Sequence, residues 1–340
     1  MSLPIDLFNV FAQFGREHRI SLRDPKALEV FIAHVSDAIA TAVARDTLLH
    51  GQRTQNMFEA LVVSLGNYKV LKTEDAGRIH PNQGFRVPDF RIILNDESQW
   101  LVEVKNIYDQ EPFRQTTKFT RSYIAELQAY ASAMRCPLKL GLYWARWRLW
   151  TLVTPEALIA DGDKLSIDMM TAMRVSEMAA VGDLTIGTKP PLKLRFVADH
   201  DKPRQLTDTN EARFTIAGVK LYCGETEILD SIEKKIAWIF MQFGEWELSG
   251  PEPVMSGNDL EAVQFEWNPI EQTNVGFEMI GTLSRMFSGY YALQTLGDTG
   301  VIQTEAELTP NWFVPLVKSE STGDALPLWR FILRPNPERA

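Results

Sequence analysis

The stretch that most constrains this chain runs from Val87 to Asn106 and reads as two short apolar strands joined by a polar turn. Asp89 opens the first strand, and Glu103 and Lys105 lie near the end of the second. Because side chains alternate between the faces of a strand, Glu103 and Lys105 share a face. Charges on an otherwise apolar hairpin are costly to bury unless they are paired or bind a metal ion. The stretch therefore predicts a site built from two carboxylates and an ammonium group.

The length of the turn decides whether the two carboxylates lie together. A turn with an odd number of residues makes Asp89 and Glu103 approximate cross-strand neighbours on one face. A two- or four-residue turn instead sets Asp89 opposite Val104. The register of this hairpin is therefore a direct test of a shared metal site.

The bulk composition is typical of a soluble globular protein. The chain has 340 residues, 45% hydrophobic and 23% charged, which is enough for two domains. No apolar run approaches the roughly twenty residues that span a bilayer, and the N-terminus does not resemble a signal peptide. Cys136 and Cys223 cannot form a disulfide framework or a zinc cluster. We therefore expect a cytoplasmic protein with no membrane segment.

Hydrophobic periodicity predicts the order of elements in the first half of the chain. Helices are expected at 7–14, from Asp24-Pro25 to Gly51, and from Thr54 to Leu65 with Gly66 closing the last one. The following pattern predicts a strand at 68–71, the hairpin, a helix at 117–134 and strands at 138–144 and 148–153. From Thr54 the order is helix, three strands, helix, two strands.

The character of the chain changes after Pro155. Residues 156–190 suggest a helical connection, and residues 191–340 suggest an α+β accessory domain. In that domain we expect helices at 229–243 and 277–293 and strands at 192–198, 214–222, 263–267, 312–317 and 328–333. The predicted organisation is a helical N-terminal region (1–53), a first α/β domain (54–155), the connection (156–190) and the accessory domain (191–340).

Pro88-Asp89 and Glu103-Val104-Lys105, preceded by the apolar Trp100-Leu101-Val102, resemble the PD-(D/E)xK nuclease superfamily. The segment Glu126–Tyr130 is similar to the Gln-Leu-x-x-Tyr helix of many members, although Glu126 stands where glutamine is usual. The resemblance covers roughly Thr54 to Val153. It implies a restriction-endonuclease-like α/β core, to which the helical N-terminal region and a second α+β domain are added.

The resemblance also implies a chemistry, namely metal-dependent hydrolysis of DNA phosphodiester bonds. Asp89, Glu103 and the Val104 carbonyl are the implied ligands of Mg²⁺, for which Mn²⁺ can substitute, and Lys105 orients or activates the attacking water. Mg²⁺ is commonly held by one or two carboxylates plus waters. Glu59, on the preceding helix, is a candidate additional acid, although an acid near a helix start is also favourable to the helix dipole.

The charge distribution favours a nucleic-acid partner only locally. The whole chain carries a formal charge of −9, which argues against binding driven by net charge. Residues 104–150 contain eight basic and three acidic residues, a local charge of +5. Lys118 and Arg121, one turn apart on the expected helix, and Arg114 before them are predicted to contact phosphates.

Aromatic residues are interleaved with this basic region. Trp147, between Arg146 and Arg148, can stack on bases or simply pack. Trp144 and Trp150 are expected to belong to a hairpin that packs on the next domain.

Several alternatives remain open from the sequence. The C-terminal domain is expected to form a homodimer or to dock a partner protein, since two sites related by a twofold axis can cut both strands of DNA. Genome defence or DNA repair fits by analogy. The alternatives are the same chemistry on RNA, or a catalytically inactive nuclease-fold module for binding or assembly. Lys105 buried against an acid, with no open path to Asp89 and Glu103, would favour the inactive module.

Overall fold

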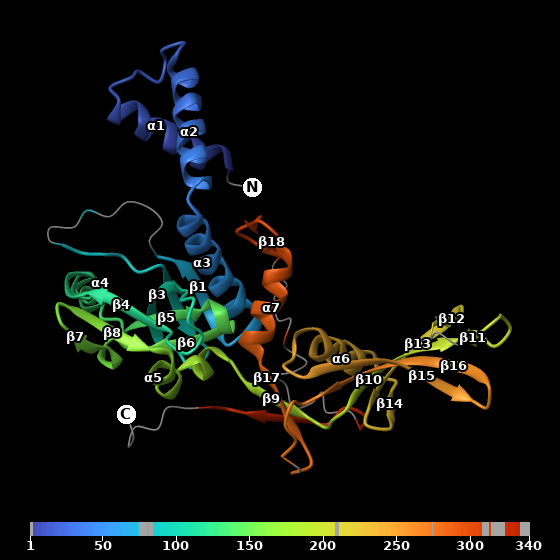
Figure 1. Cartoon of the computed structure of the whole chain (residues 1–340). Helices are drawn as coiled ribbons and strands as arrows, with labels where there is room; N and C mark the ends of the chain where they lie inside the picture. The colour runs from blue at the N-terminus through green and yellow to red at the C-terminus, as the bar shows by residue number, and fades with distance from the viewer. Residues whose placement is uncertain are drawn as a thin grey trace.

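A five-stranded sheet forms the centre of the first half of the chain (Figure 1). The computed structural model describes residues 3–74, 80, 84–207, 211–273, 275–307, 313 and 324–333. In the sheet, ordered β1-β2-β3-β5-β6, β3 and β5 run parallel and the other neighbours run antiparallel. Its strands are β1 (Tyr68–Thr73), β2 (Phe90–Leu94), β3 (Gln99–Ile107), β5 (Leu138–Trp144) and β6 (Leu149–Val153). The fold is mixed α/β, with all five predicted strands of this half present.

Two helices cover opposite faces of this sheet. Phe90 and Ile92 share a hydrophobic cluster with Phe58 of α3 (Asp46–Leu65). On the other face, Leu101 packs with Leu127 of α4 (Arg121–Ala133). Because both faces are covered, the central strands are almost continuously apolar, and the charged residues of β3 are held between two helices.

The N-terminal region is helical as predicted, but its helix boundaries differ. The helices are α1 (Leu3–Glu17), α2 (Ala27–Val43) and α3, which begins at Asp46 instead of Thr54. The helical conformation is interrupted at Arg45, whose backbone is extended. Asp46 then gives α3 an acidic first turn that suits the helix dipole. Gly66 closes α3 in the left-handed conformation (φ 77°), as the sequence predicted.

The helix predicted from Thr117 begins only at Arg121. Residues before it form β4 (Thr116–Thr120), which pairs with β8 (Lys164–Asp168). Threonine and phenylalanine favour strands, and the pairing partner lies more than forty positions along the chain, where a local pattern cannot indicate it. Thr120 ends the strand and caps α4, its Oγ1 accepting the Tyr123 N–H at 3.2 Å.

The predicted helical connection at 156–190 is largely extended. It contains β7 (Ile159–Asp161) and β8, which complete a three-stranded sheet with β4, and β9 (Thr185–Thr188). Only the short α5 (Met169–Arg174) is α-helical, starting at Asp168, whose carboxylate accepts the Thr171 N–H. This segment therefore packs onto the first α/β region as part of it.

The C-terminal region is α+β, as predicted. A second five-stranded antiparallel sheet has the order β14-β13-β10-β16-β15. The helix predicted at 277–293 is preceded by a strand, because residues 278–282 pair with β9. Of the strand predicted at 312–317, only Phe313 lies within the described residues. The elements are β10 (Leu192–Ala198), β11 (Gln205–Leu206), β12 (Ala212–Arg213), β13 (Ile216–Cys223), β14 (Thr226–Ile228), α6 (Ser231–Phe243), β15 (Glu247–Ser256), β16 (Asp259–Asn268), β17 (Glu278–Thr282), α7 (Leu283–Thr295), β18 (Leu296–Gly297), β19 (Gly300–Val301) and β20 (Leu328–Phe331).

The two halves share one hydrophobic cluster, so the predicted boundary at 155 is not a break in packing. Phe58 of α3, Trp150 of β6 and Phe287 of α7 belong to the same cluster. Trp150 Nε1 donates to Ser288 Oγ at 3.2 Å, and Arg53 Nε donates to Thr295 Oγ1 at 2.7 Å. Trp150 is buried against the C-terminal region, as expected, whereas Trp144 is buried in a second cluster formed by residues between 107 and 172, so its expected packing on the next domain was wrong.

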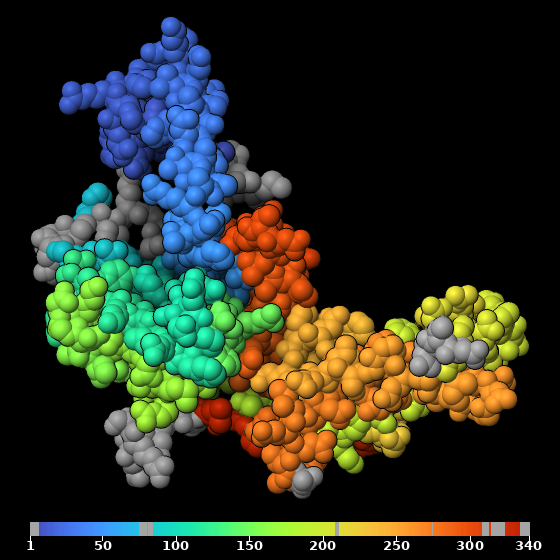
Figure 2. Space-filling view, in the orientation of Figure 1, coloured from blue at the N-terminus to red at the C-terminus, as the bar shows by residue number. Residues whose placement is uncertain are grey.

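Two parts of the molecule project from this shared body. Figure 2 shows the α1–α2 hairpin in blue and the outer part of the second sheet in yellow to orange extending outwards. Among the described residues, no single helix is long and apolar enough to cross a membrane. Only α2 and α3 taken together, which meet at 88°, reach the length and apolarity of a span.

Candidate active site

The hairpin of β2 and β3 places Asp89 beside Glu103. Phe90 pairs with Val102 and Ile93 with Gln99, and the Leu94 N–H donates to the Ser98 carbonyl at 2.9 Å. Three residues, 95–97, therefore form the turn, and Glu97 takes the left-handed conformation (φ 73°) that such a turn requires. Continuing this register by one position sets Asp89 opposite Glu103. The odd-turn arrangement predicted from the sequence is the one observed.

Asp89 is buried and held from two sides. Its Oδ1 accepts a hydrogen bond from Gln55 Nε2 of α3 at 2.6 Å, and its Oδ2 accepts the Val104 N–H at 2.6 Å. Its carbonyl accepts the Glu74 N–H at 2.8 Å. The carboxylate is therefore fixed at the point where β2 begins.

The Val104 carbonyl faces the same side as Asp89. The Leu101 N–H donates to the Pro137 carbonyl on the β5 side. Successive residues of a strand point their N–H and carbonyl groups to alternate sides of the strand. Val104 consequently points its N–H and its carbonyl towards β2, which does not extend that far. The Asp89 carboxylate and the Val104 carbonyl thus lie along one open edge of β3.

Glu103, Lys105 and Tyr123 form a second polar group on the α4 face. Lys105 Nζ donates to Glu103 Oε1 at 2.7 Å, and the Tyr123 hydroxyl donates to the same oxygen. Lys105 also lies over the Tyr123 ring, 5.0 Å from its centroid, and Arg86 lies 4.6 Å from that centroid. Glu103 is buried, whereas the Lys105 side chain is 35% exposed. Lys105 therefore links a buried acid to solvent.

Burial and charge act in opposite directions on Lys105. Burial lowers its pKa, but the charge of the Glu103 carboxylate and the hydrogen bonds of Lys105 with Glu103 and Tyr123 outweigh burial, so the pKa is raised overall. For Tyr123, burial and the Glu103 charge together raise the pKa to about 12. At neutral pH Lys105 is therefore a cation and Tyr123 a neutral donor.

The donor set fits a hard divalent cation. Asp89 and Glu103 are both buried, and Lys105 pairs with Glu103 at 2.7 Å. Two carboxylates and a backbone carbonyl are the oxygen ligands that Mg²⁺ takes, with waters or substrate oxygens completing its coordination. In the described part of the chain, no group of three or more His, Cys, Asp or Glu side chains is arranged around a common point. Any ion here would therefore rely on the backbone carbonyl and on non-protein ligands.

Glu59 lies one turn beyond Gln55 on α3 and faces a different neighbour. It lines a cavity with Tyr291 and Glu305, and burial and the Glu305 charge raise its pKa. On α3, the side chain that bonds Asp89 among those the structure describes is that of Gln55. Gln55 precedes Glu59 by four residues and therefore lies on nearly the same face of the helix.

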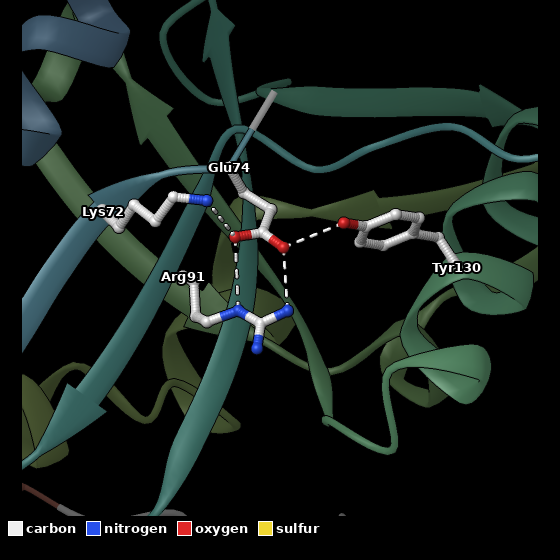
Figure 3. Close-up of polar contacts among 4 residues, drawn as sticks. All are labelled: Lys72, Glu74, Arg91 and Tyr130. Atoms are coloured by element: carbon white, nitrogen blue, oxygen red, sulfur yellow. Dashed lines mark hydrogen bonds and ion pairs between the residues drawn. The ribbon is translucent and has the colours of Figure 1, made fainter. Parts of the chain in front are cut away.

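A further buried acid next to Asp89 was not anticipated. Glu74 accepts hydrogen bonds from Arg91 at 2.8 and 3.2 Å and from the Tyr130 hydroxyl at 2.8 Å, and it pairs with Lys72 at 3.4 Å (Figure 3). Burial raises the Glu74 pKa, but the bonds from Arg91 and Tyr130 and the nearby charges outweigh burial and lower it overall. These contacts occupy the Glu74 carboxylate and anchor the backbone that holds Asp89.

One of the three predicted phosphate-binding residues is placed differently from expectation. Lys118 lies on β4, not on α4, and pairs with Asp161 at 2.7 Å. Arg121 is the first residue of α4, exposed, with Nη2 3.4 Å from the Gly162 carbonyl. Arg114 is exposed in the loop after β3. The expected pairing of Lys118 and Arg121 on one helix face was therefore wrong.

Comparison with solved structures gives likenesses that cover only part of the chain. No family model matches the chain, and no curated protein sequence matches it. Among solved structures, one that is similar is Archaeoglobus fulgidus Hjc, a Holliday junction resolvase from an archaeal hyperthermophile. The two chains are 16% identical, and the match covers 34% of this chain and 90% of that one, with a TM-score of 0.26.

Proposed function

We propose that this chain is a metal-dependent nuclease that hydrolyses phosphodiester bonds of DNA. The observation that carries the proposal is the placement of Asp89 opposite Glu103, with Lys105 bonded to Glu103 and reaching solvent. An acid pair that holds a divalent ion, with an adjacent ammonium group, can neutralise the charge that develops on the phosphoryl oxygens during such hydrolysis.

Each residue of the site has a proposed role. Asp89, Glu103 and the Val104 carbonyl would hold Mg²⁺ or Mn²⁺, which when bound lowers the pKa of water and neutralises phosphoryl charge. Lys105, protonated at neutral pH, donates a hydrogen bond to the attacking water or to a phosphoryl oxygen and is not itself the base. Gln55 and Tyr123 are positioning residues that fix the carboxylates of Asp89 and Glu103.

Cleavage assays test this proposal. The full chain is incubated with plasmid DNA and with RNA, in the presence of Mg²⁺ or Mn²⁺, beside Asp89→Ala and Lys105→Ala. We expect metal-dependent cutting of DNA that both substitutions abolish. Equal products from wild type and variants would refute the nuclease, and cleavage of RNA alone would keep the chemistry and change the substrate.

A second candidate, a nuclease-fold binding module, is favoured by the occupation of Glu103. Lys105 and Tyr123 both bond one oxygen of this acid, which resembles a structural ion pair. Against it, the Lys105 side chain remains partly exposed. DNA binding that needs no metal, without cleavage under any metal condition, would support the module.

We also propose that two copies of the chain pair through the α1–α2 hairpin, not through the C-terminal region suggested by the sequence. Among the described side chains of these two helices, only four positions are buried: Phe14, Gly15, Ala27 and Phe31. Helices gain most of their stability from packing an apolar face, so this hairpin is poorly stabilised alone. A second surface is needed to cover it.

A second copy suits the hairpin in spacing, charge and area. Leu28, Ile32, Ile39 and Val43 form an exposed stripe of nearly heptad spacing on α2, beside a groove of about 420 Å³ lined by Phe14 and other apolar side chains. α2 contains no lysine or arginine, so two copies meet along its exposed stripe without basic repulsion. The basic residues of the hairpin lie at the end of α1 and in the connection to α2, namely Arg16, Arg19, Arg23 and Lys26. Two helices of about 25 Å in length have a projected area of about 500 Å² on one face. Because side chains make the accessible area larger than the projected area, this approaches the roughly 800 Å² per partner of a standard interface.

A further inference from the structure

The loop that follows β3 exposes aromatic side chains next to the candidate active site. Phe113 is 90% exposed, the highest value among the described large hydrophobic residues, and Tyr108 is 64% exposed. Exposed aromatic rings in a cluster mark an interaction site more often than a packing defect. Tyr108 lies three residues beyond Lys105, about 10 Å along an extended chain.

This loop is held in place, so the exposure of Phe113 does not come from fraying. Gln115 is buried, and its Nε2 donates to the carbonyls of Asp109 at 3.0 Å and Glu111 at 2.8 Å. From the neighbouring β5–β6 connection, Trp147 Nε1 donates to the Pro112 carbonyl at 2.8 Å. Two loops are therefore joined at the carboxyl end of the parallel strands β3 and β5.

The joined loops present rings and cations together. The ring centroids of Phe113 and Trp147 lie 6.1 Å apart, with their planes tilted by 57°. Arg114, which follows Phe113 in the sequence, and Arg146, which precedes Trp147, are both exposed. Arg148 follows Trp147. Against these three cations the two loops carry two acids, Asp109 and Glu111, of which Asp109 is engaged by the Glu111 N–H at 2.9 Å. The surface thus combines stacking faces with a slight positive excess.

We propose that Tyr108, Phe113 and Trp147, with Arg114 and Arg146, form a subsite for unpaired nucleotides beside the active site. This inference rests on the proposed nuclease function and narrows its substrate to DNA with single-stranded or unpaired bases near the cleavage point. Every base offers a face for stacking, so the rings bind without sequence preference while the arginines contact phosphates. Bases in an intact duplex are already stacked on one another and offer no free face to Phe113.

Binding measurements without cleavage test the subsite. The full chain in EDTA is titrated into a fluorescein-labelled single strand of about 12 nucleotides, within the usual site size for stacking proteins, and into the matching duplex. We expect tighter binding to the single strand, weakened about tenfold by Phe113→Ala and retained by Phe113→Tyr, because each stacked base contributes that order of affinity. Arg146→Ala should reduce the salt dependence by roughly one phosphate contact.

A matched control and a cleavage assay separate the possible failures. Trp238→Ala removes an exposed ring of α6 and should leave binding unchanged. Single-strand binding by Phe113→Ala equal to wild type, or tighter wild-type binding to the duplex, would overturn the subsite. Because no metal is present, these results are independent of catalysis. A chain that binds as expected but never cleaves would instead refute the proposed function and leave the stacking surface standing.

Discussion

Gln55 and Tyr123 hold the two acids of the candidate site, and neither lies in the segment that defines the site in sequence. Gln55 bonds Asp89 from α3, and Tyr123 bonds Glu103 from α4. These two hydrogen-bond donors therefore come from helices on opposite faces of the sheet. Side chains that hydrogen-bond to metal ligands orient these ligands, and substituting such side chains commonly lowers metal affinity by 10- to 100-fold.

Substitutions on α3 distinguish Gln55 from Glu59. Gln55→Ala should raise the Mg²⁺ concentration needed for half-maximal cleavage by roughly tenfold, because Asp89 loses the donor that fixes its Oδ1. Glu59→Gln, on the same helix, should change this concentration little, since Glu59 faces Glu305. Metal titrations of both variants measure the difference. A larger effect of Glu59→Gln would restore Glu59 as the additional acid.

At this scale, strand geometry alone predicted the odd turn of the hairpin and the shared face of Glu103 and Lys105, which bond each other. Contacts across elements were not predictable in this way. The Tyr123 hydroxyl reaches Glu103 only because α4 packs on β3, which no local pattern indicates.

At the scale of elements, the main error concerned segments whose partners are distant in the chain. Residues 116–120 and 164–168 form a strand pair, although each was predicted as helix or helical connection. Helix periodicity is a local signal, whereas strand pairing depends on a partner that a window of residues does not contain. This is why the helix of Glu126 was predicted, but the place of Lys118 was not.

Asp183, whose carboxylate accepts the Ser284 N–H at the start of α7, should make the free energy of unfolding depend on pH. Burial raises the pKa of Asp183 to about 6, although its hydrogen bonds with Ser284 act in the opposite direction. The unfolded value is about 3.9, so the favourable contribution of the protonated acid is present below about pH 4 and is lost as pH rises through 6. Asp183→Asn keeps an oxygen acceptor for the Ser284 N–H and removes the ionisation.

Urea unfolding of wild type and Asp183→Asn across pH 4 to 8 tests this. The free energies of unfolding should be similar near pH 4, and the variant should become more stable by roughly 3 kcal/mol towards pH 8. A difference that stays constant with pH would contradict the raised pKa. The comparison between variants cancels the titration of the other groups.

The α1–α2 hairpin should determine the oligomeric state. Ile32→Glu combined with Ile39→Glu places charges in the exposed stripe and should convert a dimer into a monomer without loss of helicity. Sedimentation equilibrium measures the mass, and Ile216→Glu with Val219→Glu on the exposed face of β13 is the matched control. A monomeric wild type that binds lipid vesicles, or a dimer unaffected by the hairpin substitutions, would refute pairing through this surface.

At the scale of the whole molecule, the sheet β1-β2-β3-β5-β6 and α7 share one hydrophobic core. Phe58, Trp150 and Phe287 belong to one cluster, and Trp150 bonds Ser288. A fragment of residues 1–190, which lacks α7, should therefore fail to unfold cooperatively, whereas the full chain should. Thermal melts followed by circular dichroism measure this. A sharp transition for the fragment would show that the predicted boundary near 155–190 separates independent domains.

The central claim is that Asp89 and Glu103 together hold a divalent ion, and calorimetric titration with Mn²⁺ tests it most directly. We expect a single site per full-length chain that is lost in both Asp89→Asn and Glu103→Gln. Glu227→Gln should retain the site, because Glu227 lies on β14 of the second sheet, where it pairs with Lys220. A wild-type chain that binds no ion, or an Asp89→Asn variant that binds as tightly as wild type, would contradict the claim.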